Sequence, residues 1–314
     1  MNSDSADRLP ITELENDRSA NLSSLSVREI VRLMNAEDAQ VATAVGEVLP
    51  EIESAVTAIV ERLSAGGRLF YIGTGTSGRL GVLDAAECPP TFGVSRELIQ
   101  GVIAGGYEAC YRAVEASEDD PDSAKQDLLA RGFRKEDALV GIAASGRTPY
   151  TVGAVSYARN LGAFTAAITC APQSPITQAA EVSIVPVVGP EVLAGSTRLK
   201  AGTAQKMVLN MISTATLVKL GYVSGNRMSN IRGSNTKLRA RAIRVIMAET
   251  GLDYHAATNA LDAADGDTKL ALVMIRTGSD RQSATAALAD AKGVVHVAIK
   301  RIHEITRNES QTAH

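Results

Sequence analysis

Two stretches of the chain end in the same kind of turn. Residues 68–79 and residues 138–149 each begin with a short apolar run and continue into a turn rich in hydroxyl groups and glycine, and both turns contain Ser-Gly-Arg. Such an apolar run is typical of a buried parallel strand, and the turn that follows it can present backbone N–H groups and hydroxyls to an anion at the start of a helix. Two such turns in one sheet indicate a phosphate-bearing ligand at the carboxyl ends of the strands.

The first turn fits two nucleotide-binding patterns only in part. Residues 73–78 match the dinucleotide pattern G-x-G-x-x-G, but the expected end of the second strand, residues 104–106, is an alanine and two glycines and lacks the acidic side chain that binds ribose. The P-loop pattern fails because arginine and leucine follow Gly78, where lysine and then serine or threonine are required. Neither a dinucleotide nor a nucleoside triphosphate is therefore the expected ligand.

Short hydroxyl side chains suit a phosphomonoester, because they donate to phosphate oxygens without adding bulk. The alternative is two ordinary strand–helix turns whose serines cap helices. The expected ligand-binding residues of the two turns are Thr74, Thr76, Ser77, Gly78, Ser145, Gly146, Arg147 and Thr148.

A third hydroxyl pair, Ser196 and Thr197, precedes a long helix expected over residues 201–220. Both residues either cap this helix or contact the ligand. Lys200 and Lys206 could pair with a phosphate or a carboxylate, although a lysine at the start of a helix is more often solvated.

Carboxylates are the simplest candidates for acid–base chemistry, since all four histidines fall in the last quarter of the chain. The helix that begins near Ser77 is expected to stop at Cys88-Pro89-Pro90, which places Glu87 in its last turn. The helix dipole disfavours negative charge there, so Glu87 is a candidate proton donor, with a surface glutamate as the alternative. Glu118 lies in the acidic run 115–120, which by itself would be a solvated patch.

The apolar runs predict five strands, at residues 69–73, 98–103, 138–143, 164–169 and 182–187, with crossover helices over 108–116, 123–130 and 151–161. This alternation predicts an α/β fold with a doubly wound, five-stranded parallel sheet. Helical periodicity from residue 27 predicts N-terminal helices, and an alanine-rich tail without strands predicts a small helical bundle. The expected domains are an arm at 1–22, an α/β domain at 23–235 and a helical domain at 236–314.

The composition limits the partners and the cellular compartment that we expect for the protein. Of the 314 residues, 45% are hydrophobic, and the net charge of −3 gives no electrostatic reason to expect nucleic acid or an anionic membrane as a partner. The three cysteines have no paired spacing and are expected to be buried thiols in a reducing cytosol. The N-terminus lacks a basic segment followed by an apolar one, so the protein is expected in the cytoplasm.

The chain resembles the N-acetylmuramic acid 6-phosphate etherases, a glucokinase regulatory protein-like family of the sugar isomerase (SIS) domain superfamily. The match covers most of the chain, and its segments are Thr12-Glu13 with the Asn-Asp-Arg that follows, residues 73–81, 84–91, 103–106, 143–150 and 200–206. The resemblance implies a SIS-type fold and a homodimer that splits N-acetylmuramic acid 6-phosphate into N-acetylglucosamine 6-phosphate and D-lactate during cell-wall recycling. The family's two catalytic glutamates correspond to Glu87 and Glu118.

The implied chemistry requires no metal, nucleotide or other cofactor. In the open-chain sugar the C2 proton is α to an aldehyde, so a carboxylate can remove it and lactate can leave from C3. We expect Glu87 to protonate the departing lactate oxygen and to activate water, and Glu118 to act at C2 or in ring opening; the reverse assignment fits the sequence equally. Because a helix rises about 1.5 Å per residue, Ser77 and Glu87 are about 15 Å apart. A hexose phosphate is too short for that distance, so Glu87 is expected from the neighbouring subunit.

Two other functions share these motifs. An aldose–ketose phosphosugar isomerase would use the same sheet and turns without an acid at C3. The second is a noncatalytic phosphosugar sensor similar to the regulatory protein of glucokinase. The presence of both Glu87 and Glu118 weighs against this function. The C-terminal bundle resembles the ubiquitin-associated type.

Overall fold

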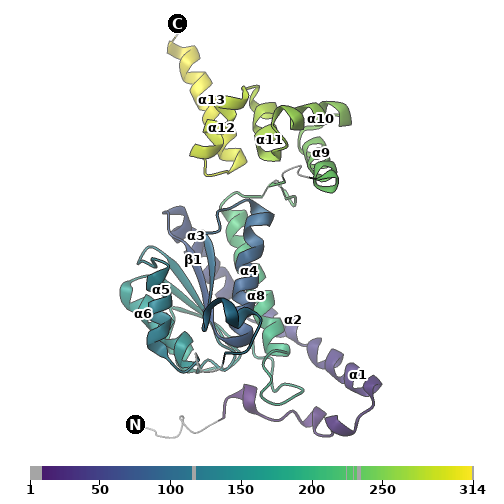
Figure 1. Cartoon of the computed structure of the whole chain (residues 1–314), viewed down its shortest axis with the longest axis vertical. Coiled ribbons are helices and arrows are strands. Elements are labelled where there is room, and N and C mark those ends of the chain that lie inside the picture. The colour runs from purple at the N-terminus through teal and green to yellow at the C-terminus, as the bar shows by residue number, and fades with distance from the viewer. Residues whose placement is uncertain (1–8, 115–117, 224, 229, 232–234, 313–314) are drawn as a thin grey trace. The chain divides into compact units, whose positions relative to one another are not determined.

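The computed structural model describes residues 9–312 except 115–117, 224, 229 and 232–234, and its strands form one five-stranded parallel sheet (Figure 1). The strands are β1 (Leu69–Gly73), β2 (Ile99–Ile103), β3 (Ala138–Ile142), β4 (Phe164–Ile168) and β5 (Val182–Ile184). Their order across the sheet is β2-β1-β3-β4-β5, and all four pairings are parallel. The predicted fold class is confirmed, with a fifth strand that is shorter than expected.

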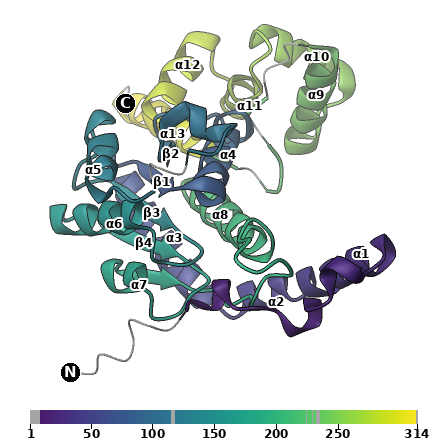
Figure 2. The ribbon, with the colours of Figure 1, turned by 60° about the horizontal axis from the view of Figure 1, so that its bottom comes forward.

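Helices cover both faces of the sheet (Figure 2), and the side chains of a strand alternate between these two layers. Phe70 and Ile72 of β1 belong to a core shared with helices α5 (Pro121–Ala130), α6 (Pro149–Leu161) and α7 (Pro175–Ala179). Tyr71 points the other way, toward Gly81 of helix α4 (Gly75–Phe92). Because both faces are covered, β1, β3 and β4 are buried at every position, as their apolar runs predict.

Helix α4 is longer than the sequence predicts. The expected stop at Cys88-Pro89-Pro90 is wrong, because both prolines lie inside the helix. Two successive prolines remove two N–H donors, but only near the end of the helix, and the carbonyl oxygen of Pro89 still accepts from the backbone N–H of Gly93 at 2.9 Å. Asn230 Nδ2 donates to the same oxygen at 3.4 Å. The helix continues past the prolines to Phe92.

The crossover after β2 also differs from the prediction. Instead of an α-helix over 108–116, the chain forms a short 3-10 helix, η4 (Gly106–Cys110), and residues 115 and 116 lie outside the described residues. The other two crossover helices are confirmed as α5 and α6. The long helix expected over 201–220 is α8 (Lys200–Lys219).

Three helices precede the sheet: α1 (Val27–Asp38), α2 (Val41–Gly46) and α3 (Leu49–Ser64). Helix α1 begins at a capping box, in which the Ser26 side chain accepts from the N–H of Glu29 and the Glu29 carboxylate accepts from the N–H of Ser26. Helix α3 contacts β3, β4 and β5. The segment before α1 forms three short 3-10 helices, η1 (Ile11–Glu13), η2 (Asp17–Ser19) and η3 (Leu22–Ser24), and Thr12 within it is buried.

A buried carboxylate, Glu37, connects the N-terminal segment to helix α8 through hydrogen bonds. Its oxygens accept from Lys200 Nζ at 2.6 Å, Arg18 Nη1 at 2.6 Å and Asn16 Nδ2 at 2.9 Å. Lys200 is thus buried and paired with a carboxylate rather than solvated, whereas Lys206 is exposed. We call Asn16, Arg18, Glu37 and Lys200 the Glu37 cluster.

Two of the three cysteines are buried as expected, and Cys110 is half-buried. Burial, with a smaller contribution from the charge of Glu191, raises the pKa of Cys170 to about 12. Its thiol is therefore inert at neutral pH.

The chain forms two compact units, one of residues 1–86 and 96–216 and the other of residues 87–95 and 217–314. The second unit contains α9 (Thr236–Thr250), α10 (Tyr254–Ala263), α11 (Thr268–Thr277), α12 (Arg281–Asp290) and α13 (Val295–Thr312). It has its own apolar core, which includes Ile246, Leu261 and Val273. Helices α9 to α12 each begin at an Asn or Asp whose side chain accepts from the N–H three residues later.

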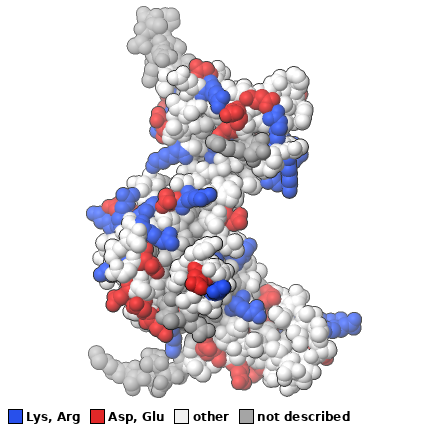
Figure 3. All heavy atoms as spheres, viewed as in Figure 1, with Lys and Arg blue, Asp and Glu red and all other residues white. Residues whose placement is uncertain are grey.

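The surface carries acidic and basic side chains in an interspersed pattern on the face drawn in Figure 3. Within the described ranges, no helix is both long and apolar enough to cross a membrane.

Candidate active site

The two hydroxyl turns lie side by side at the carboxyl edge of the sheet. Strand β1 pairs with β2 on one side and β3 on the other, so the chain changes direction between β1 and β3, and ligands of doubly wound sheets bind at such a switch point. Gly73 and Ile142, the last residues of β1 and β3, are register partners. The turns that follow them therefore begin at the same level.

The first turn brings the start of α4 directly over the strand ends. A side chain at Gly73 would place its Cβ 2.8 Å from the carbonyl oxygen of Ile142 and 3.0 Å from the backbone nitrogen of Gly78. Only glycine permits this approach, which leaves the first N–H groups of α4 at the switch point. Thr74, Ser77 and Gly78 are buried there and Thr76 is half-buried.

Ser77 makes a contact that the sequence did not reveal. Its hydroxyl Oγ donates to the side-chain oxygen Oε1 of Gln205 at 3.0 Å, and Gln205, on α8, is fully buried. A glutamine has no charge and no fixed spacing from the first turn, so no pattern in the sequence connects the two residues.

The second turn is held by its own backbone and packs against the side chain of Ser174. The backbone N–H of Gly146 donates to the carbonyl of Ala143 at 3.0 Å, and that of Arg147 donates to Ser145 Oγ at 3.3 Å. Gly146 has a φ of +66°, and a Cβ there would stand 2.1 Å from Ser174 Oγ.

Thr148 is the N-cap residue of α6, yet its side chain makes no capping hydrogen bond in the described structure. Thr148 and Ser145 are half-buried and Arg147 is exposed. The Thr148 hydroxyl is therefore not used to cap α6.

The third hydroxyl pair lies beside the first turn. Ser196 and Thr197 are half-buried in the loop before α8, and a Cβ at Gly202, in the first turn of α8, would stand 3.4 Å from both Thr76 Cγ2 and the carbonyl oxygen of Thr197. This proximity is compatible with ligand contact by the two hydroxyls.

An internal carboxylate already occupies the N-terminus of α8. Glu191, which is buried, accepts from the backbone N–H of Lys200 at 3.0 Å and of Ala201 at 2.9 Å. Burial raises the pKa of Glu191, and these two N–H groups oppose that rise. The backbone N–H groups of Lys200 and Ala201 therefore already have an acceptor within the chain.

Glu118 lies close to the starts of both α4 and α6. Its carboxylate oxygen Oε1 is 3.5 Å from the position of a Cβ at Gly75, and its backbone carbonyl accepts from the N–H of Tyr150, in the first turn of α6, at 3.1 Å. The side chain is half-buried. A carboxylate is thus placed beside the start of α4, within reach of a ligand whose phosphate binds there.

Comparison with known proteins identifies the family of the chain. Residues 51–159 match the glucokinase regulatory protein N-terminal SIS domain and residues 118–215 match the SIS domain. The N-acetylmuramic acid 6-phosphate etherase of Clostridium beijerinckii is 52% identical over 83% of this chain and 86% of its own length, and that of Symbiobacterium thermophilum is 54% identical over 83% and 87%. The chain belongs to the N-acetylmuramic acid 6-phosphate etherase family.

A solved structure is similar in fold. The putative phosphosugar isomerase from Bacteroides fragilis aligns with a TM-score of 0.48 and 23% identity, over 62% of this chain and 91% of that one.

In this etherase-family chain, Glu87 is an exposed side chain on α4. Because α4 ends at Phe92, Glu87 does not lie in the last turn. The prediction that Glu87 is a proton donor because of the helix dipole therefore has no basis in the structure. The helix is continuous from Ser77 to Glu87, so the rise of about 15 Å between them stands.

A second carboxylate on α4, Asp84, is buried and was not predicted as a site residue. It accepts from Asn210 Nδ2 at 2.6 Å and from Ser213 Oγ at 3.2 Å, both on α8. Burial raises the pKa of Asp84 against these hydrogen bonds. Asp84 therefore joins α4 to α8, the two helices that carry Ser77 and Gln205.

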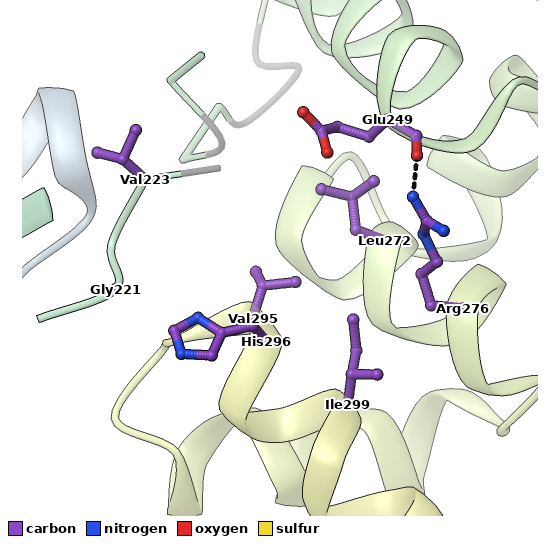
Figure 4. Close-up of a pocket in the computed structure, with 8 residues that line it drawn as sticks. All are labelled: Gly221, Val223, Glu249, Leu272, Arg276, Val295, His296 and Ile299. Atoms are coloured by element: carbon purple, nitrogen blue, oxygen red, sulfur yellow. Dashed lines mark hydrogen bonds between the residues drawn. The ribbon is translucent and has the colours of Figure 1, made fainter. Parts of the chain in front are cut away.

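The helical unit of the etherase-family chain contains a separate cavity of about 330 Å³. Apolar side chains such as Leu272 and Ile299 line it together with His296 and Arg276, and Arg276 donates to the backbone carbonyl of Glu249 (Figure 4). None of the predicted ligand-binding or catalytic residues lines this cavity.

Proposed function

We propose that the chain cleaves the D-lactyl ether of N-acetylmuramic acid 6-phosphate, giving N-acetylglucosamine 6-phosphate and D-lactate, in cell-wall recycling. Membership of the etherase family supports this function. The observation that carries it is the Glu118 carboxylate beside Gly75, where it faces the start of α4 between two hydroxyl turns.

The phosphate binds at the switch point between β1 and β3. The first N–H groups of α4 and the hydroxyls of Thr74, Thr76 and Ser77 donate to its oxygens. Ser145 and Thr148 contribute from the second turn, and Ser196 and Thr197 from the loop before α8. None of these residues supplies a proton-transfer group, so the turns hold and orient the sugar.

The reaction is an elimination followed by hydration. Glu118 takes the C2 proton of the open-chain sugar, the C2–C3 double bond forms, and the C3–O bond breaks as Glu87 protonates the lactate oxygen. Glu87, now a carboxylate, removes a proton from water, whose oxygen adds to C3, and Glu118 returns the proton to C2. One water is consumed, and both carboxyl groups end in their starting states.

The proposed enzyme is a homodimer in which Glu87 reaches the active site of the neighbouring subunit. Two facts support this: Glu87 is exposed, and about 15 Å of helix separates it from Ser77, more than a hexose phosphate spans. The substrate is a phosphorylated sugar, which fits an enzyme of the cytoplasm. The division into an arm (1–22), a SIS-type domain (23–235) and a helical domain (236–314) remains part of the same proposal.

The deciding experiment is incubation of the purified chain with N-acetylmuramic acid 6-phosphate and enzymatic assay of D-lactate. Stoichiometric release of D-lactate and N-acetylglucosamine 6-phosphate is expected. A folded protein that releases no D-lactate would overturn the proposal. Conversion of a phosphosugar aldose to its ketose without lactate would instead identify an isomerase.

A further inference from the structure

Only one of the two polar atoms of the Gln205 side chain has a hydrogen-bond partner among the described residues. Its oxygen Oε1 accepts from Ser77 Oγ at 3.0 Å, but its nitrogen Nε2 is buried and has no partner among the residues that the structure describes. Gln205 is fully buried, so solvent does not satisfy Nε2. A buried donor without an acceptor is costly, and native structures contain few of them.

The bond to Gln205 also conflicts with phosphate binding. A serine hydroxyl has one proton, and Ser77 gives it to Gln205 Oε1. A phosphate monoester that is doubly charged only accepts hydrogen bonds, so Ser77 cannot donate to it and to Gln205 together. In this arrangement Ser77 would present a lone pair to the phosphate and repel it.

Rotation of the amide about its last side-chain bond removes the conflict. In the rotated form Nε2 donates to Ser77 Oγ, and the Ser77 proton is free to point at an anion. Each orientation makes one bond to Ser77 and leaves one amide atom without a partner. The two forms are therefore close in energy in the empty site, and an anion that binds only the second form selects it.

We propose that Gln205 is a positioning residue of the phosphate subsite, which turns its amide over when the phosphate arrives and thereby makes Ser77 a donor to it. The inference rests on the proposed function for the identity of the sugar, but the class of ligand, a phosphate monoester, follows from the two-turn site. Gln205 touches Ser77 and not the reacting atoms, so its effect falls on binding.

Two substitutions separate the amide's two roles. Gln205→Glu keeps an acceptor for Ser77, removes the donor and adds a negative charge, so it fixes Ser77 in the orientation that rejects phosphate. Gln205→Leu removes both polar atoms and leaves Ser77 free. We expect Gln205→Glu to raise KM for N-acetylmuramic acid 6-phosphate by about 10- to 100-fold, the range of a lost hydrogen bond to a charged group, with kcat within about threefold. Gln205→Leu is expected to raise KM less.

Thr216→Val is the matched control. Thr216 lies on α8 about three turns beyond Gln205, is fully buried, and has a hydroxyl without a partner in the described parts of the chain. It lies outside the proposed binding residues, so its removal is expected to leave KM and kcat unchanged. Circular dichroism and thermal unfolding establish that all variants are folded.

A double-mutant cycle with Ser77→Ala gives the decisive readout. If Gln205 acts through Ser77, Gln205→Leu has no further effect on KM in the Ser77→Ala background. Additive effects, or a KM of Gln205→Glu equal to that of Thr216→Val, would overturn the inference.

Titration of each variant with N-acetylglucosamine 6-phosphate and with inorganic phosphate measures binding without turnover. If wild type binds these anions and Gln205→Glu binds them at least about tenfold more weakly, the inference stands even if no D-lactate is released, and only the proposed function fails. Equal affinities in the two proteins would overturn the inference.

Discussion

Glu118 and Gly75 lie against each other although a whole strand and its crossover separate them in the chain. The Glu118 carboxylate oxygen Oε1 is 3.5 Å from the point where a side chain at Gly75 would begin, and the Glu118 carbonyl is bonded to the N–H of Tyr150 at 3.1 Å. The backbone of Glu118 is thus bonded to α6, and its carboxylate lies beside the start of α4. Its position depends on both hydroxyl turns.

Glu118→Gln should therefore remove catalysis while leaving binding intact. The amide is the same size but exchanges no proton, so we expect kcat to fall by about 10²- to 10⁴-fold, the usual contribution of a general acid or base. The dissociation constant of N-acetylglucosamine 6-phosphate should change by less than about threefold, because the phosphate contacts remain. Asp119→Asn, at the adjacent exposed residue, is the control and should retain wild-type kcat. Full activity in Glu118→Gln would exclude the proposed proton transfer.

Mixing two inactive variants tests whether Glu87 acts across a dimer. In a heterodimer of Glu87→Gln and Glu118→Gln subunits, one site contains both glutamates if they come from different subunits, and neither site does if they come from the same one. Unfolding and refolding the equimolar mixture should restore about a quarter of wild-type activity, since half of the dimers are mixed and half of their sites are intact. Each variant refolded alone should stay inactive. If the two variants carry different affinity tags and heterodimers are isolated through both tags, no recovery of activity in those heterodimers would place both residues in one subunit.

The sheet was predictable because β1, β3 and β4 are mainly apolar runs bounded by turn residues, the pattern expected of parallel strands that are covered on both faces. The exceptions have local causes. Pro89 and Pro90 predict a helix end, but the carbonyl of Pro89 finds donors in Gly93 and Asn230, and α4 continues. Only the fold brings Asn230 to this carbonyl, so the sequence shows no sign of the contact.

Of the candidate site, the backbone parts were predictable and the side-chain partners were not. Hydroxyl- and glycine-rich turns after strands indicate an anion site wherever the sheet places them. By contrast, three buried polar residues were found only in the structure. Gln205 accepts from Ser77, and Asp84 connects α4 to α8. Glu191 accepts from the first N–H groups of α8. Nothing in the sequence distinguishes a buried glutamine or carboxylate of this kind from a solvated one.

Substitution by alanine is expected to affect stability and KM differently at two glycines that both have positive φ. Gly146→Ala adds strain at φ +66° and also a Cβ 2.1 Å from Ser174 Oγ, so the turn has to move. Gly162→Ala, at φ +88° with no atom within 4 Å of the added Cβ, adds the strain alone. We expect Gly162→Ala to lower the free energy of unfolding by about 1–2 kcal/mol with normal KM. Gly146→Ala should cost more stability and also raise KM about tenfold or more. Chemical denaturation and steady-state kinetics measure the two quantities, and equal KM values would show that the second turn does not bind the substrate.

The Glu37 cluster predicts a stability that depends on pH. Lys200 and Glu37 have side chains only 3% and 4% exposed, so Glu37→Gln leaves a buried ammonium without its counter-charge and should lower the free energy of unfolding by about 3 kcal/mol at pH 7. Arg18→Met removes the other charged partner of Glu37, but Arg18 is 53% exposed, and this control should cost less than about 1 kcal/mol.

The sign of the pH dependence follows from the pKa of Glu37. Burial alone would raise this pKa, but hydrogen bonds from Lys200 and Asn16, with the charges of Lys200 and Arg18, outweigh burial and lower it below its ordinary value of 4.5. The folded state thus binds fewer protons than the unfolded state near that pH, and the contribution of Glu37 is complete above pH 4.5 and is lost as the pH falls through the lowered value. Urea denaturation of wild type and Glu37→Gln should give a constant difference from about pH 7 to pH 5 that shrinks below pH 4.5. A difference that persists unchanged in acid would mean that the carboxylate charge does not stabilise the cluster.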